Sequence, residues 1–263
     1  MQDTEAKIAV AARAAGYRSA RRYKARARAV FGGVPLAQRR VLDVGCGSGA
    51  FALWAGIHGA AKVLGIEPET AGSTKGTLER FRWTIQELQL ERTVFAKEAS
   101  LEDLSPDAGP FDVAILYNVI NHLDEEATTR LHRDTDAVAR FVAILTRLRE
   151  LLAPDGIVLV VDMARFNLWN MVGLKSPFAP TIEWHKHQQP EVWIRTFEQA
   201  GYRLRDLDWN PLYPLGRLSQ NRAMQYLTGS SFILRMRVAN KADYGGPARS
   251  RAATGSHPSC VAL

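Results

Sequence analysis

Short apolar runs alternate with segments of helical periodicity along most of the chain. The apolar runs lie at residues 41–44, 61–66, 93–97, 111–117 and 157–161. Between them, apolar side chains recur at spacings of three and four, as at Leu78, Phe81 and Ile85. Short buried strands separated by amphipathic helices are typical of parallel βαβ units. The pattern therefore predicts an α/β fold with a doubly wound, mostly parallel sheet.

Two more strands are predicted near the end of the chain. Residues 202–209 form one, with a slip in the alternation near Arg205, and residues 232–238 alternate as a last strand that we expect to be antiparallel. A helix is predicted from Pro190, because proline is favoured in the first turn of a helix. Before it, residues 163–189 form an insertion rich in Trp, Phe, Pro and His, which suits an aromatic-walled pocket.

A glycine-rich turn follows the first strand and leads into a helix. Gly45, Gly47 and Gly49 can adopt backbone angles that other residues avoid, so the turn can lie close against a ligand. Glu67 ends the next apolar run, where a carboxylate is spaced to accept hydrogen bonds from both hydroxyls of a ribose. Together these residues predict a site for a cofactor that contains a nucleoside.

Two kinds of cofactor fit this turn. Its glycines also match a dinucleotide pattern, Gly-x-Gly-x-x-Ala, so a nicotinamide or flavin enzyme is an alternative. Asp43 favours the other kind, since a carboxylate just before the turn is poorly placed beside a pyrophosphate and well placed to meet the ammonium of a methionine group. With Glu67 and the run at 111–118, residues 39–238 resemble the class I, Rossmann-like S-adenosylmethionine-dependent methyltransferases.

The resemblance implies a seven-stranded sheet with an antiparallel last strand, S-adenosyl-L-methionine as cofactor, and methyl transfer as the reaction. It assigns cofactor binding to Asp43, Gly45, Cys46, Gly47, Gly49, Glu67, Pro68, Glu98, Ala99, Ser100 and Asn118. In this family an acidic residue after the third strand accepts the adenine amino group. Glu98 takes that place here, with Glu102 or Asp103 as alternatives.

Composition divides the chain into three parts. Residues 1–38 form a basic N-terminal helical cap, residues 39–240 the methyltransferase domain with its substrate-pocket insertion at 163–189, and residues 241–263 a tail whose Gly, Ser, Pro and Ala content predicts disorder. No apolar run approaches the ~20 residues of a membrane helix, and we expect a cytoplasmic enzyme. The two cysteines, Cys46 and Cys260, support neither a disulfide framework nor a zinc site.

The positive charge is concentrated at the N-terminus. The net charge is +7, and the first forty residues hold ten Lys and Arg against Asp3 and Glu5. Such an arm is suited to RNA phosphates, anionic lipid or an acidic substrate, whereas a solvated helical face is the simpler interpretation. In the resembled family an N-terminal helix often covers the cofactor, which would make Tyr17 or Tyr23 a contact of that lid, with packing in the core as the alternative.

Transfer to a neutral nucleophile also requires a base, and histidine is suited to that role near neutral pH. Three histidines are expected near the carboxyl edge of the sheet: His122, His185 and His187. His185 is preferred because in an extended segment it would share a side with Glu183, which could orient its ring. The same alternation leaves a metal site formed by Glu183, His185 and His187 as an alternative.

We therefore expect a methyltransferase that acts on a small molecule, most readily by O-methylation. The residues expected to bind the acceptor are Tyr17, Asn121, Trp169 and Trp184. One alternative is an RNA-modifying methyltransferase that uses the basic arm, although no RNA-binding module is apparent. The other is a protein that binds S-adenosylmethionine without catalysis. The sequence leaves the oligomeric state open.

Overall fold

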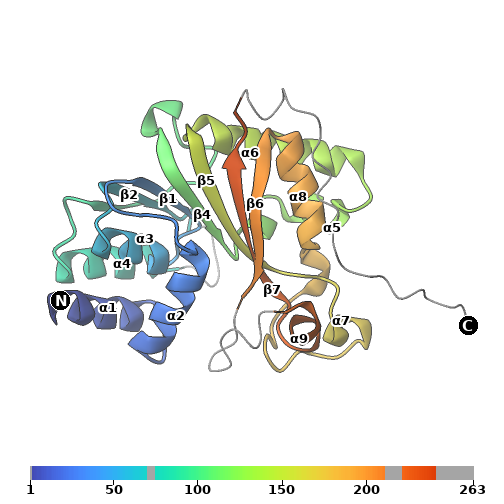
Figure 1. Cartoon of the computed structure of the whole chain (residues 1–263), viewed down its shortest axis with the longest axis horizontal. Helices are drawn as coiled ribbons and strands as arrows, with labels where there is room; N and C mark the ends of the chain where they lie inside the picture. The colour runs from blue at the N-terminus through green and yellow to red at the C-terminus, as the bar shows by residue number, and fades with distance from the viewer. Residues whose placement is uncertain (1, 70–74, 211–220, 241–263) are drawn as a thin grey trace, which may run out of the picture.

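The computed structural model describes residues 2–69, 75–210 and 221–240, and all structural statements concern these residues (Figure 1). Its strands are β1 (Arg40–Val44), β2 (Lys62–Ile66), β3 (Val94–Lys97), β4 (Phe111–Tyr117), β5 (Leu152–Met163), β6 (Tyr202–Trp209) and β7 (Ser231–Val238). They form one seven-stranded sheet in the order β3-β2-β1-β4-β5-β7-β6. Only β7 runs antiparallel to its neighbours, β5 and β6. The predicted fold class is confirmed.

Helices cover both faces of the sheet. On one face lie α1 (Gln2–Ala14), α2 (Ala20–Phe31), α3 (Ala50–Ile57) and α4 (Thr77–Glu87), at the left of Figure 1. On the other lie α5 (Glu125–Arg130), α6 (Thr135–Glu150) and α8 (Pro190–Gln199). Each layer buries its own apolar cluster, with Phe81 in the first, and Phe141 and Trp193 in the second. The hydrophobic effect of these two clusters holds the layers on the sheet.

The ends of the elements follow local sequence signals. Ser19 caps α2 by accepting a hydrogen bond from the Arg22 amide at 3.3 Å, and Pro190 occupies the first turn of α8. The predicted slip in β6 is a bulge between Leu204 and Asp206. β5 begins earlier than predicted, at Leu152, because this residue pairs with Phe111 before a register shift.

The buried side chain of Arg235 connects the N-terminal helix α2 to strands β6 and β7. The Arg235 side chain on β7 is 3% exposed and lies 2.7 Å from the Asp208 carboxylate, with a further ion pair to Asp206. It also donates to the Ala29 carbonyl in the last turn of α2, at 2.5 Å. A Cβ at Gly32 would collide with this guanidinium, so a larger residue there would displace Arg235. α2 is therefore part of the layer that covers the sheet.

The segment after β5 folds into short turns beyond the carboxyl edge of the sheet. It contains α7 (Leu168–Met171) and a 3₁₀ turn, η4 (Trp184–Lys186), and α7 lies beside α9 (Arg222–Leu227) in the lower part of Figure 1. The predicted extended conformation at residues 183–187 is therefore wrong. No described helix is long and apolar enough to cross a membrane. The predicted tail, 241–263, lies outside the described residues.

Candidate cofactor and acceptor sites

The glycine turn joins β1 to α3 in a conformation that requires glycine. Gly45, Gly47 and Gly49 all have positive φ, at 64°, 50° and 78°. An added Cβ at Gly45 would lie 2.3 Å from Val119, and one at Gly49 would lie 2.2 Å from Phe81. At Gly47 it would meet no protein atom within 4 Å. The turn is packed on two sides and open at Gly47, where a ligand can approach the backbone.

Glu67 lies where the sequence places it, at the end of β2 beside this turn. Its side chain is buried, and its Oε2 accepts a hydrogen bond from the Gly47 amide at 3.0 Å. It also lines a cavity of about 770 Å³ at the carboxyl ends of β1, β2 and β4. The carboxylate thus stabilises the turn and keeps an oxygen available for ligand hydroxyls.

Asp43 is almost fully buried under the turn. Its Oδ2 accepts from the Ala52 amide in the first turn of α3, at 3.0 Å. The pKa of the Asp43 carboxyl is raised from 3.8 to about 7. Burial is the main cause, and this net value includes a lowering effect of the Ala52 hydrogen bond and a smaller raising effect of the Glu67 charge. Ionising this buried carboxyl group is costly unless a cation lies beside it. The group is therefore suited to pair with an ammonium.

The cavity brings together six of the eleven predicted cofactor residues. Gly45, Glu67, Pro68, Ala99, Ser100 and Asn118 line it. Glu98 is exposed and does not line it, whereas the alternative Glu102 does. Asp103 instead holds the loop, since its Oδ2 accepts from the Ser100 amide and hydroxyl at 2.7 Å each. Cys46 is a buried free thiol whose pKa is raised well above its usual value by burial.

His122 is the candidate base that lines this cavity. Its Nδ1 lies 2.7 Å from the Glu125 carboxylate, and its Nε2 lies 3.4 Å from the Asn121 amide nitrogen. Glu125 is also paired with Lys186 at 3.0 Å, and these contacts hold its pKa below the usual range. Half of the His122 side chain is exposed. It is the last residue of η3 (Ile120–His122), just before α5, and lies at the rim of the cavity.

His185, the preferred base, does not have the partner that alternation suggested. The residue is exposed, and the Glu183 carboxylate pairs with Lys186 at 2.8 Å. The error arises because residues 184–186 form a 3₁₀ turn, in which side chains three apart face each other. The described residues also hold no cluster of three or more His, Cys, Asp or Glu side chains positioned for a metal ion.

His187 has the partner that the sequence analysis missed. Its Nδ1 lies 2.8 Å from Oδ1 of Asp162, and the two side chains are 11% and 0% exposed. Asp162 lies near the end of β5, one residue beyond Val161, whose carbonyl accepts a hydrogen bond from the Asn118 amide at 2.8 Å. The signal for it was present as an acidic residue that closes a buried strand at the carboxyl edge of the sheet.

The four residues expected to bind the acceptor lie in different environments. Tyr17 packs on Tyr23 at a ring distance of 5.2 Å, and burial raises the pKa of its hydroxyl, with a smaller effect of Tyr117 at the end of β4. Asn121 is buried with its Oδ1 unpartnered. Trp169 donates its indole N–H to the Leu227 carbonyl at 3.1 Å, and Trp184 is buried against His187.

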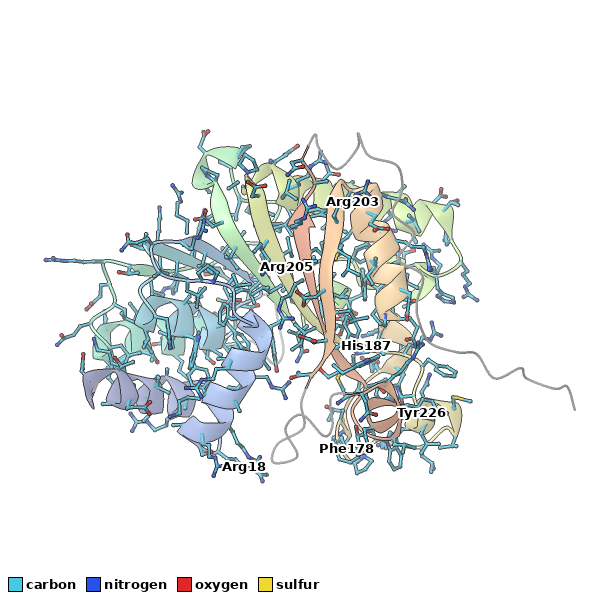
Figure 2. The ribbon with its side chains drawn as sticks, in the orientation of Figure 1. Arg18, Phe178, His187, Arg203, Arg205 and Tyr226 are labelled. Atoms are coloured by element: carbon cyan, nitrogen blue, oxygen red, sulfur yellow. The ribbon has the colours of Figure 1, made fainter. Side chains whose placement is uncertain are left out.

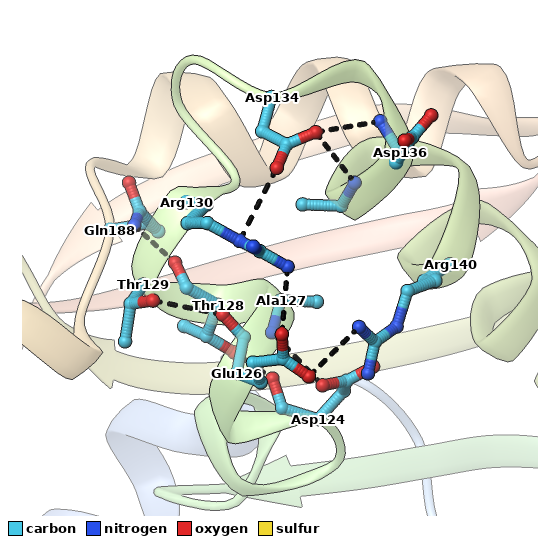
Figure 3. Close-up of polar contacts among 11 residues, drawn as sticks. Asp124, Glu126, Ala127, Thr128, Thr129, Arg130, Asp134, Asp136, Arg140 and Gln188 are labelled. Carbon is cyan, nitrogen blue, oxygen red and sulfur yellow. Dashed lines mark hydrogen bonds and ion pairs between the residues drawn. The ribbon is translucent and has the colours of Figure 1, made fainter.

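Residues 124–134, which lead from the end of β4 towards α6 and include α5, support the segment that carries His187. Figure 3 shows Gln188 donating to the Thr128 carbonyl of α5, at 2.5 Å. α5 is itself held by Arg140, whose guanidinium lies 2.7 Å from Asp124 and 3.2 Å from Glu126. These contacts fix His187 between α5 and the sheet.

Part of the positive charge of the N-terminal arm is paired within the fold. Lys24 lies 2.8 Å from Glu5, and Arg13 lies 2.9 Å from Glu87. Arg18 and Arg28 are exposed, and Arg18 marks the lower end of this layer in Figure 2. The arm is therefore a partly neutralised helical surface.

Comparison with known proteins identifies the family. Residues 16–207 match the family described as methyltransferase domain, which covers more than half of the chain. The chain belongs to this family, and it is an S-adenosylmethionine-dependent methyltransferase. Its cofactor is S-adenosyl-L-methionine. Three features of the site fit this cofactor: the open backbone at Gly47, the buried carboxylate of Glu67, and the carboxyl of Asp43, whose ionised form a cation would stabilise. No curated protein matches the chain.

Solved structures agree with the fold at low sequence identity. The pyocyanin biosynthetic protein PhzM has a TM-score of 0.55 at 17% identity, over 82% of this chain and 55% of its own. A SAM-dependent methyltransferase from Aquifex aeolicus has a TM-score of 0.54 at 14% identity, over 81% and 89%. The mitomycin 7-O-methyltransferase MmcR has a TM-score of 0.53 at 15% identity, over 84% and 55%. This chain thus matches about half the length of PhzM and of MmcR.

Proposed function

We propose that the protein transfers the methyl group of S-adenosylmethionine to an oxygen of a small molecule, with His187 as the base. The contact between His187 and the buried Asp162 carries this proposal. The solved structures similar in fold include an O-methyltransferase of a small molecule, MmcR, which is consistent with it. The bound cofactor supplies an electrophilic methyl group on a sulfonium. The chain has to align the acceptor and remove its proton.

The Asp162 contact supports the assignment through the tautomer of the imidazole. Asp162 is fully buried and acts as an acceptor, so Nδ1 of His187 carries the proton. Nε2 is then unprotonated and can accept a proton from an acceptor hydroxyl. The carboxylate also stabilises the imidazolium that forms. This is the arrangement in which a buried carboxylate orients a histidine base.

The other two histidines fit this role less well. His122 is half-exposed, and its carboxylate partner Glu125 is shared with Lys186. His185 is exposed, and the pairing of Glu183 with Lys186 leaves it without an orienting carboxylate. Burial and a dedicated acceptor favour His187, because a base that works in a dry site depends on fixed geometry.

The test compares methyl transfer with cofactor binding in the same variants. Transfer is followed as S-adenosylhomocysteine release with a panel of phenols and hydroxylated aromatic compounds. We expect His187→Ala to lower the rate ~10² to 10⁴-fold and Asp162→Asn to lower it by ~10 to 10²-fold, with calorimetric affinity for S-adenosylmethionine nearly unchanged. His185→Ala is the matched control and should retain the rate.

The outcomes separate the candidates. A rate that survives His187→Ala and is lost in His122→Ala moves the base to His122. Conversely, a rate that is unaffected by either change means that alignment alone drives transfer to an acceptor that is already nucleophilic. A protein that binds the cofactor and releases no S-adenosylhomocysteine with any oxygen nucleophile contradicts the proposal as a whole.

A further inference from the structure

A second cavity lies at the carboxyl end of β6, and it has no residue in common with the cofactor cavity. Its volume is about 580 Å³, within the range of sites for small ligands. Its walls are mostly apolar, and polar groups come from two residues. The apolar side chains are those of Phe166, Trp209, Tyr226 and Leu227, and the polar ones those of Gln189 and Arg222. Cofactor binding does not account for this second cavity.

The walls present aromatic rings to the cavity and leave apolar surface uncovered. Phe166 and Tyr226 face each other at a ring distance of 5.5 Å and an angle of 40°. The Tyr226 hydroxyl donates to the Met171 sulfur at 2.9 Å, so its polar atom is already used. Phe166 is nevertheless 56% exposed and Leu227 47% exposed. Large apolar groups left open around a cavity are suited to a ligand that covers them.

The polar groups indicate what such a ligand carries. Nε2 of Gln189 is buried and has no hydrogen-bond partner among the described residues. An unsatisfied buried donor is costly, and an oxygen acceptor on a ligand would satisfy it. Arg222 lies at the rim, where its side chain is 72% exposed and its guanidinium is 3.7 Å from the Glu191 carboxylate. The ligand is therefore mostly apolar, with an acceptor oxygen such as a carbonyl.

The chain links this cavity to the proposed base. Gln189 follows His187 by two residues, and Gln188 between them is fixed on Thr128 of α5. α5 begins at Glu125, which lines the cofactor cavity. One short segment thus carries the base and contributes to the wall of the second cavity.

We infer that this second cavity is the acceptor site, and that the acceptor is a planar, largely apolar aromatic molecule with a carbonyl-type oxygen. The inference rests on the proposed function, because it takes the same enzyme to be an O-methyltransferase. Aromatic walls bind the faces of a planar ring system, and Gln189 donates to its carbonyl. The remaining hydroxyl of the acceptor is the group that His187 deprotonates.

The test measures binding of 7-hydroxy-4-methylcoumarin, a planar fluorescent compound with a lactone carbonyl, to the full chain in the presence of S-adenosylmethionine. Ala223 lines the cavity on an exposed face of α9, so Ala223→Trp fills the cavity and should weaken binding ~10-fold or more. Ala139→Trp, at an exposed position of α6 outside the cavity, should leave the affinity unchanged.

A second variant tests the polar contact. Gln189→Leu removes the donor, and it should weaken coumarin binding ~3 to 10-fold while leaving 2-naphthol, which has no carbonyl, unaffected. Coumarin binding that is absent in the wild type, or that Ala223→Trp does not weaken, overturns the inference. Calorimetric titration of the same samples with S-adenosylmethionine tests the fold of each variant. Failure to bind the cofactor at all would instead count against the proposed function.

Discussion

Because the carboxyl of Asp43 is buried, we predict that the affinity for the cofactor depends on pH near neutrality. Asp43 is 2% exposed, and its pKa is raised from 3.8 to about 7, mainly by burial, with the Ala52 amide lowering it and the Glu67 charge raising it within that value. A pKa in this range means that protonated and ionised Asp43 coexist near neutral pH in the cofactor-free protein. We expect the ammonium of the methionine group to bind to the ionised form of Asp43.

The size of the effect follows from the pKa change. Moving the pKa from 3.8 to about 7 corresponds to roughly 4 kcal/mol, at 1.36 kcal/mol for each pKa unit. The pKa of this acid is raised in the folded state, so the folded protein binds more protons than the unfolded chain between about pH 4 and 7. The stability of the cofactor-free protein should fall as the pH rises through this window. Above about pH 7 the full cost of ionising Asp43 is present.

Cofactor binding should show the opposite trend. Binding of the ammonium requires that Asp43 release its proton, so affinity should rise by up to ~10-fold for each pH unit below the pKa. The amino group of the cofactor loses its own proton above about pH 8. The rise should therefore be visible between about pH 5.5 and 7 and should level off above that.

Calorimetric titration of the wild type and of Asp43→Asn measures this directly. The asparagine keeps an acceptor for the Ala52 amide but cannot ionise. We expect it to bind S-adenosylmethionine about 1.5 to 3 kcal/mol more weakly near pH 7.5, with little change of affinity between about pH 5.5 and 7. Its cofactor-free form should be more stable than the wild type above pH 7, by up to about 4 kcal/mol.

Asp112→Asn provides the control. Asp112 lies at the start of β4, where it pairs with Arg39 at 3.0 Å and accepts from the Arg40 amide at 2.8 Å. Its loss should leave the pH dependence of cofactor affinity unchanged. If the wild-type affinity is constant from about pH 5.5 to 7, or if Asp43→Asn keeps the wild-type slope, the reasoning about Asp43 is refuted.

Two further predictions concern the same cofactor site. Glu67→Ala should weaken S-adenosylmethionine binding by about 1.5 to 3 kcal/mol. Glu67→Gln should weaken it by less, because glutamine keeps an acceptor for the Gly47 amide. If calorimetry gives the wild type and Glu67→Ala the same affinity, the prediction is wrong. Gly45→Ala should destabilise the protein by about 2 to 4 kcal/mol, because its Cβ collides with Val119 at a positive φ. Gly33→Ala has positive φ without a collision, so denaturant unfolding should show a loss of only about 1 to 2 kcal/mol.

The sheet and the cofactor turn were predictable because their signals are local. Each strand is a short apolar run, and the parallel pairing follows from the helices between the runs. The bulge at Arg205 was visible as a slip in the alternation. Glu67 and the glycine turn lie near each other in the sequence, and the carboxyl edge of a parallel sheet brings such residues together.

The acceptor side was less predictable because it depends on long-range contacts. His187 and Asp162 are 25 residues apart, and nothing in the intervening insertion fixes how the chain returns. The preference for His185 assumed the period of an extended strand. A single 3₁₀ turn at Trp184 changes which side chains share a side, and it turns Glu183 towards Lys186.

The packing of the N-terminal helices also depends on a long-range contact, that of Arg235, which the sequence did not predict. This contact determines how the basic arm should be tested. Side chains alternate along β7, so Arg235 lies on the other face of the strand from Phe232, Leu234 and Met236. A charged side chain on that face is expected to meet solvent. In the fold that face is covered by α2, and Asp206 and Asp208 neutralise the guanidinium. Removing α2 would expose this pair and the apolar residues around Tyr23, so a deletion there tests folding rather than RNA binding. The charge of the arm is better tested by substituting the exposed Arg18 and Arg28, which leaves the contact of Arg235 with Ala29 intact.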